Sequence, residues 1–146
     1  MPSSTLQPFY VFGENLAEKV HNLQSDTLKV MLTNTAPTAS TGTIKTDITE
    51  ITAGNGYTAG GATLTVSSSS QASGLYKLVI ADVTITASGG SIGPFRYAVI
   101  YNDTPTSPAD PLIGYFDYGS AITLGDGEAF TLDFDGTNGV FTINVA

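Results

Sequence analysis

AFTLDFDGTNGVFTINV, residues 129–145, carries the strongest indication of the fold. Apolar and polar residues alternate on both sides of its central turn residues, as they do in strands that bury one face. Residues Thr131, Asp133 and Asp135 are expected to face away from the core. The predicted core residues of this stretch are Phe130, Leu132, Phe134, Phe141, Ile143 and Val145.

The turn in this stretch has two possible interpretations. DFDGTNG, residues 133–139, has the carboxylates and glycines of a calcium loop, but an EF-hand loop needs glycine at its sixth position and glutamate at its twelfth. Asn138 and Asn144 stand there instead. Asn138 and Gly139 both tolerate positive φ, so the sequence predicts a tight hairpin between two paired strands. A looser calcium site that joins one of these aspartates to another loop stays open.

Most of the remaining chain has the pattern of short strands. Runs rich in β-branched and aromatic residues are separated by clusters of Gly, Pro, Ser and Asp, which form turns. We therefore predict a mainly β fold, an antiparallel β-sandwich of the jelly-roll or immunoglobulin-like type. The other runs are LKVMLT (28–33), ATLTVS (62–67), LYKLVIADVTITA (75–87), FRYAVIYN (95–102), PLIGYFDYG (111–119) and SAITL (120–124).

One segment near the N-terminus has helical periodicity. Between Glu14 and Leu23 the apolar residues fall on one stripe, which predicts a short α-helix. The residues of this stripe are Leu16, Ala17, Val20 and Leu23. We expect residues 1–12 to form an extended N-terminal arm and residues 13–146 to form a single β-sandwich domain.

Charge and cysteine content exclude several classes of function. The 146 residues carry a formal net charge of −8, and beyond Arg96 there are seven acidic residues and no Lys or Arg. Such a surface repels phosphate backbones, so nucleic acid is not expected as a partner. No apolar run approaches the roughly 20 residues of a membrane span, and no signal-peptide pattern is present. With no cysteine, disulfides, thiolate zinc sites and cysteine nucleophiles are excluded.

No group of residues predicts catalysis. The single histidine, His21, is expected on the polar side of the predicted helix, and no G-x-S-x-G motif accompanies the serines. AGNGYTAGG, residues 53–61, lacks the third glycine of a dinucleotide-binding loop and is interpreted as a turn. We therefore expect no enzyme activity, no catalytic residue, no cofactor and no metal ligands.

Aromatic residues gather in two neighbouring strand patterns. They are Tyr97, Tyr101, Tyr115, Phe116 and Tyr118. Because strands alternate, some of them must face away from the core if Phe116 faces it. Tyr101, Tyr115 and Tyr118 are thus a candidate exposed aromatic interface for a protein or a sugar. The alternative is that they line the core with their hydroxyls reaching solvent.

Five longer stretches resemble a group of small virion structural proteins of tailed bacteriophages and prophages. They are DTLKVMLTNTAPTAS (26–40), DITEITAGNGYTAGG (47–61), LVIADVTITASGGSIGPFRYAVIYND (78–103), DPLIGYFDYGS (110–120) and DGEAFTLDFDGTNGVFTI (126–143). The resemblance implies a non-enzymatic capsid decoration, or cement, protein, made in the bacterial cytoplasm and bound to the outer capsid surface of the virion. Its expected partners are the major capsid protein and further copies of itself, as a homotrimer that gains affinity from multivalent contact.

The first dozen residues match this group least well. We interpret them as part of the anchor, by strand addition to a neighbour or to the shell. The candidate contact residues are Pro8, Phe9, Tyr10 and Phe12. Two alternatives to a decoration protein are retained: a phage tail, baseplate or fibre-associated structural protein, and a carbohydrate-binding module that uses exposed tyrosines and Asp117.

Overall fold

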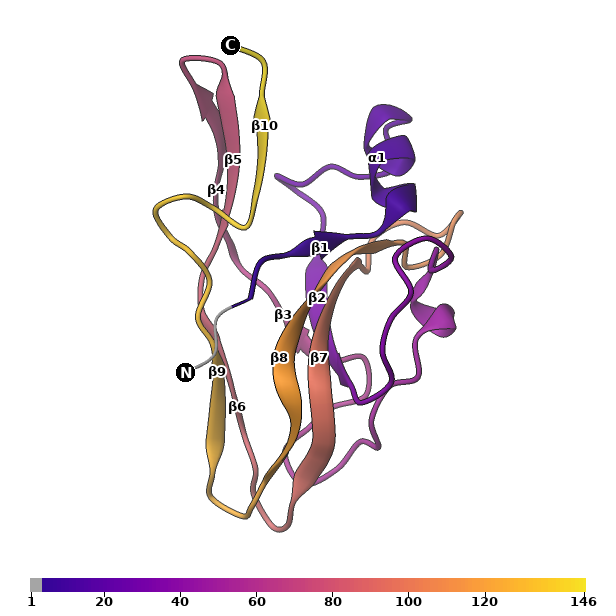
Figure 1. Ribbon diagram of the computed structural model, residues 1–146, viewed down its shortest axis with the longest axis vertical. Helices are drawn as coiled ribbons and strands as arrows, with labels where there is room; N and C mark the ends of the chain where they lie inside the picture. Colours follow the sequence, from indigo (N-terminus) through magenta and orange to yellow (C-terminus); the bar gives the residue numbers. More distant parts are fainter. Residues whose placement is uncertain (1–3) are drawn as a thin grey trace.

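The computed structural model describes residues 4–146 and confirms a mainly β fold with antiparallel sheets, arranged as a β-sandwich (Figure 1). The strands are β1 Gln7–Pro8, β2 Leu28–Thr33, β3 Ala62–Thr63, β4 Val66–Ala72, β5 Leu75–Ile80, β6 Val83–Thr86, β7 Ile92–Asn102, β8 Leu112–Leu124, β9 Ala129–Leu132 and β10 Phe141–Asn144. Helix α1 spans Tyr10–Ala17 and the 3-10 helix η1 spans Lys45–Asp47. In this part of the chain, neither helix has the length and apolar character that crossing a membrane requires.

The first layer is a five-stranded sheet in the order β1-β8-β7-β2-β3. It carries apolar cores on both faces. From β2, Val30 and Leu32 enter the main core, whereas Met31 enters a second core with Phe9 and Leu112. A strand that is buried on both faces has no need to alternate. This explains why the run LKVMLT alternates only weakly.

The second layer is organised around one long stretch, residues 75–86, which forms β5 and then β6. β10 pairs with β5 and β9 pairs with β6, and both pairings are antiparallel. β9 and β10 therefore run in the same direction. The segment 133–140 is a loop that interrupts what would otherwise be one continuous strand. The predicted hairpin is wrong, because the strands on either side of the turn pair with a common neighbour and not with each other.

The turn itself is held by Asp135. Its carboxylate accepts hydrogen bonds from the backbone N–H groups of Asn138 (2.8 Å) and Thr137 (2.9 Å) and from Nδ2 of Asn138 (2.9 Å). These bonds, with that of the Asn138 backbone the largest, hold the pKa of Asp135 below its usual range. Gly139 then takes a φ of 85°, which only glycine adopts without strain.

The predicted core of this stretch is confirmed for its first four residues and wrong for its last two. Leu132 and Phe134 are buried, and Phe130 is half-buried against the main core. Phe141 is half-buried against the main core, with its ring centroid 4.9 Å from that of Phe12. Ile143 and Val145, in contrast, are 38% and 81% exposed. They lie on or just after β10, an edge of the three-stranded sheet β10-β5-β4, which we call the projecting sheet because its far end extends beyond the sandwich (Figure 1).

The N-terminal segment packs on the sandwich from residue 4 onward. β1 pairs with β8, and the backbone N–H of Phe9 donates to the carbonyl of Ile113 at 3.1 Å. Helix α1 begins at Tyr10, four residues earlier than predicted, and it ends at Ala17 because Lys19 has a left-handed φ of 67°. The boundary predicted after residue 12 therefore falls inside α1. Residues 1–3 of the predicted arm lie outside the described residues.

A buried polar cluster connects the segment after α1 to the end of β7. His21 is 6% exposed and does not lie on a polar helix face, contrary to the prediction. Its Nδ1 accepts a hydrogen bond from Nδ2 of Asn102 at 3.1 Å, and the same Nδ2 donates to Asp26 at 2.7 Å. The proton of the neutral ring is thus on Nε2, which, like Nδ2 of Asn15, has no partner within residues 4–146. Burial lowers the pKa of His21, and the charge of Asp26 opposes this shift.

We expect the free energy of unfolding to fall as the pH is lowered from about 7.5 to about 5.5. The unfolded chain takes up a proton at His21 below pH 6.5, whereas the folded chain resists it, so stability is complete above that pH and is lost below it. One proton contributes at most about 1.4 kcal/mol per pH unit. Urea unfolding of the wild-type chain and of His21→Gln at both pH values measures the effect. An equal pH dependence in both proteins would contradict this assignment.

Candidate binding groove

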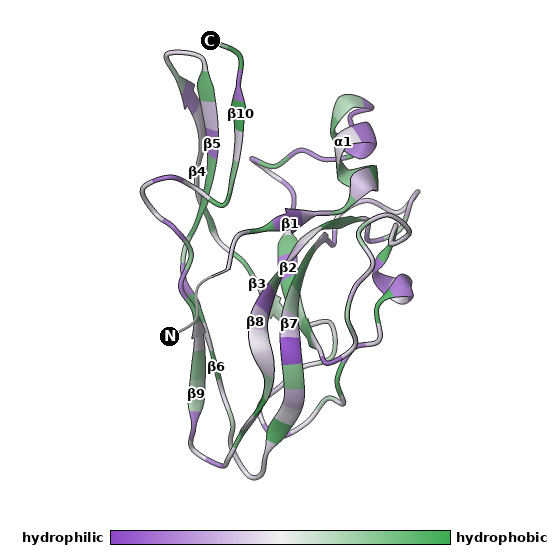
Figure 2. Cartoon of the chain, in the orientation of Figure 1, coloured by the Kyte–Doolittle hydropathy of each residue, from purple (hydrophilic) through white to green (hydrophobic). Residues whose placement is uncertain are grey.

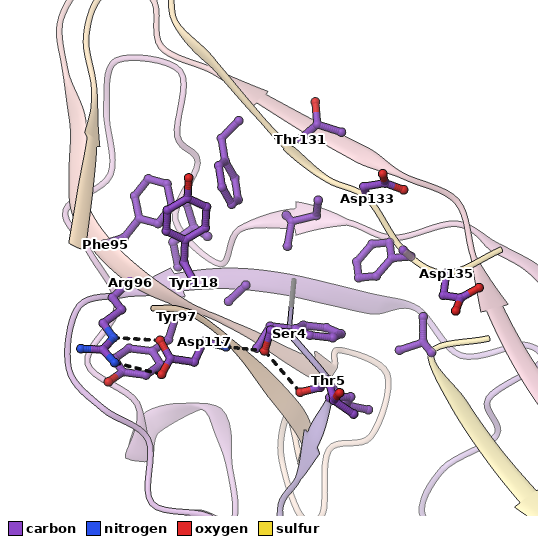
Figure 3. A pocket seen from close by; sticks show the side chains of 18 of the residues that line it. Ser4, Thr5, Phe95, Arg96, Tyr97, Asp117, Tyr118, Thr131, Asp133 and Asp135 are labelled. Atoms are coloured by element: carbon purple, nitrogen blue, oxygen red, sulfur yellow. Dashed lines mark hydrogen bonds and ion pairs between the residues drawn. The ribbon is translucent and has the colours of Figure 1, made fainter. Parts of the chain in front are cut away.

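A groove of about 490 Å³ separates the two layers where β8 faces β9 (Figure 3). The sandwich is open along this side because β8 and β9 are not hydrogen-bonded to each other. Within residues 4–146, β8 pairs on its outer side only with Gln7 and Pro8, and β9 pairs only with β6. The loop 133–140 and the segment that begins at Ser4 border the groove at one end.

The walls of the groove are aromatic. Phe130 of β9 lies edge-on to Phe95 of β7 and to Tyr118 of β8, with ring centroids 5.1 Å and 5.7 Å away. Further along, Phe116 and Phe134 lie 5.9 Å apart. Each pair joins side chains from opposite walls, and such pairs contribute roughly 0.5–1.5 kcal/mol beyond their buried area. The aromatic contacts therefore hold the two layers together along the open side.

One rim of the groove carries an ion pair on neighbouring strands. The Arg96 guanidinium donates from Nε to Oδ1 of Asp117 at 2.8 Å and from its terminal nitrogen to Oδ2 at 3.0 Å (Figure 3). Ser4 Oγ accepts a hydrogen bond from the backbone N–H of Asp117 at 3.1 Å. The hydrogen bonds from Arg96 lower the pKa of the Asp117 carboxyl. Both side chains are more than a third exposed, so the pair contributes little to stability. The guanidinium lies over the ring of Tyr97, and Asp117 alternates with Tyr118 along β8, so its side chain points to the opposite face of that strand from the Tyr118 ring.

Two acidic residues lie on the opposite rim of the groove. Asp133 and Asp135 both line the groove, but the Asp135 carboxylate is already used by its own turn. Within residues 4–146, no three His, Asp or Glu side chains come together as ligands.

The structure separates the three tyrosines predicted as an exposed interface. Tyr101 is wholly buried in the second core, and its hydroxyl donates to the carbonyl of Gly60 at 2.5 Å, so its predicted exposure is wrong. Tyr115 is half-buried, and its ring packs 5.5 Å from that of Phe9. Only Tyr118 lines the groove, beside Asp117.

The four candidate anchor residues also have different environments. Phe9 and Phe12 are 1% and 2% exposed and belong to the chain's own cores. Pro8 is exposed in β1, and Tyr10 is 74% exposed at the start of α1. A partner that meets this segment would therefore touch Pro8 and Tyr10 and leave the two phenylalanines covered.

Several residues that line the groove were not identified from the sequence, among them Phe95, Arg96 and Phe130. Each lies in a recognised strand pattern, and Phe130 was expected to be a core residue. Nothing local indicates that β8 and β9 face each other across an open side. The one available signal was the Asp117–Tyr118 pair, which does lie at the groove.

Comparisons of the chain with family models, with curated proteins and with solved structures found no match.

Proposed function

We propose that this chain is a non-enzymatic structural protein of a tailed-phage virion, a head decoration protein that binds the assembled capsid surface. The observation that carries the proposal is the resemblance of five stretches between residues 26 and 143 to small phage virion proteins. These stretches include β2 and β7 of the first layer and β6 and β9 of the second, so the resemblance concerns both layers and not one motif.

Charge and chemistry agree with an outer position. A net charge of −8 disfavours contact with packaged DNA and favours the exterior of the shell. The sandwich needs no disulfide, because it buries two apolar cores. A domain of this kind folds in the reducing cytoplasm of a host and is retained in a particle outside it.

Immunogold labelling of purified particles tests the proposal. We expect an antibody against the chain to label the heads of particles produced by the phage or prophage that encodes it. Labelling of tails or baseplates would replace the decoration protein by the tail-associated alternative. Unlabelled particles, in preparations whose lysates contain the chain, would reject a virion role altogether.

The groove supports a second candidate function, carbohydrate binding. Its lining includes Tyr118, Arg96 and Asp117, and an aromatic ring with charged hydrogen-bonding groups nearby is a common way to bind a sugar. A glycan array with the wild-type chain and Tyr118→Ala measures this. Binding lost in Tyr118→Ala and kept in Tyr10→Ala, which changes an exposed tyrosine outside the groove, would favour this function.

A further inference from the structure

The outer edge of β10 lacks the features that usually prevent one sheet edge from pairing with another. Residues 136–146, GTNGVFTINVA, contain no charged side chain and no proline. β10 is an edge strand of the projecting sheet in the described structure, and hydrophobic and hydrophilic residues alternate along it (Figure 2). Ile143 on this strand and Val145 just after it are exposed. Natural edge strands are usually blocked by charges, by prolines or by a covering segment. An unblocked edge of this kind is a surface for strand pairing.

The register of β10 shows which backbone groups point outward. Ile143 pairs with Tyr76, and the N–H of Val145 donates to the carbonyl of Gly74 at 2.9 Å. In an antiparallel ladder, alternate residues exchange hydrogen bonds with a given neighbour. Odd-numbered residues of this segment therefore bond to β5, and the backbone N–H and C=O groups of Thr142 and Asn144 point to the free side.

Charge favours a second copy of the chain at this edge. Two chains of net charge −8 repel each other over most of their surfaces. The strands of the projecting sheet, however, contain no Asp or Glu, and their only charged residue is Lys77. Two copies of the chain can therefore approach each other at this sheet with little electrostatic repulsion.

We propose that two copies of this chain pair through β10, antiparallel and related by a two-fold axis at Ile143. Thr142 of each copy then exchanges backbone hydrogen bonds with Asn144 of the other, which satisfies the outward groups of both strands. Ile143 faces its own counterpart, and Phe141 faces Val145. All these apolar side chains lie on one face of the resulting six-stranded sheet, so apolar groups meet apolar groups.

The other edge of the projecting sheet is a poorer match. β4, VSSSSQA, directs the backbone groups of Ser69 and Gln71 outward, because Ser70 and Ala72 bond to β5. In an antiparallel pairing of β10 with β4, Thr142 and Asn144 would bond to Gln71 and Ser69, which would place Ile143 and Val145 against the side chains of Ser70 and Ser68. The β10 pairing does not depend on the proposed virion role. Because its symmetry is two-fold, it forms a dimer, whereas the resemblance implies a trimer.

Cysteine cross-linking tests the register, because the chain has no cysteine of its own. We expect Ile143→Cys to form a disulfide-linked dimer on mild oxidation, since residues directly opposite in a non-hydrogen-bonded pair lie about 4.5 Å apart between Cα atoms. Asn144→Cys is the matched control, because its nearest counterpart is a diagonal neighbour about 7–8 Å away, beyond disulfide reach. Equal cross-linking of both variants, or of neither, would overturn the proposal.

Sedimentation equilibrium tests the pairing without a covalent bond. We expect the wild-type chain to dimerise at concentrations up to about 1 mM, a limit that corresponds to about 4 kcal/mol of binding free energy. Thr142→Pro removes an outward N–H that the monomer does not use, and Ile143→Lys sets two positive charges face to face, so both variants should stay monomeric. Ser70→Lys, on β4, should dimerise like the wild type. A wild-type chain that is monomeric or trimeric over this range would refute the two-fold pairing.

Discussion

Gly61→Ala is expected to destabilise the chain by at least about 4 kcal/mol, the range of substitutions that force a backbone apart. Gly61 precedes β3 and has a φ of 83°, a conformation that costs an alanine about 1–2 kcal/mol. A Cβ there would also overlap the carbonyl oxygen of Val30 and lie 2.6 Å from its carbonyl carbon. Val30 pairs with Ala62 within the first layer, so the overlap can be relieved only by separating β2 from β3.

Gly89→Ala is the matched control for this prediction. Gly89 has a φ of 84°, nearly the same as that of Gly61, but a Cβ at this position would have no atom within 4 Å. It should therefore lose only the backbone contribution, about 1–2 kcal/mol. Urea unfolding of both variants separates the two effects. Equal losses in the two proteins would show that the contact with Val30 is not the cause.

The fold class could be predicted because strand alternation is local. Residues 130–134 show it directly, and the side chains of Leu132 and Phe134 are buried as expected. Pairing between strands is not local, and this is where the prediction failed. The length of the run 75–87 could have indicated this pairing. A strand of that length needs paired strands of similar total length, and β9 and β10 provide them together.

The same difficulty applies to the candidate site. Tyr101 was expected to be exposed because strands alternate, but β7 is covered on both faces near its end, by the main core and by a second core that includes Phe9. The second core depends on the N-terminal segment folding back over the first layer, a contact more than 90 residues away in sequence. Tyr118 is half-buried and lines the groove, on a strand whose outer edge is open, and its predicted role in an interface stays a prediction.

Phe9→Ala is expected to cost about 3–5 kcal/mol, as truncations of buried phenylalanine do. Phe9 is 1% exposed and lies in the second core with Met31, Val99 and Leu112, where its ring also contacts that of Tyr115. Removing the ring leaves a cavity between the N-terminal segment and the first layer, and both are held in place by β-sheet hydrogen bonds, so the cavity closes poorly. Denaturant unfolding followed by circular dichroism measures the loss.

Comparing Tyr10→Ala with Phe9→Ala separates loss of capsid binding from loss of stability. Tyr10 is adjacent in sequence but 74% exposed, so its truncation should change the free energy of unfolding by no more than about 0.5 kcal/mol. If the N-terminal segment anchors the chain to a capsid, Tyr10→Ala should reduce occupancy on purified heads while the fold stays intact. Phe9→Ala should reduce occupancy only in proportion to its unfolded fraction. A Tyr10→Ala chain that is stable and binds heads as the wild type does would remove Tyr10 from the anchor.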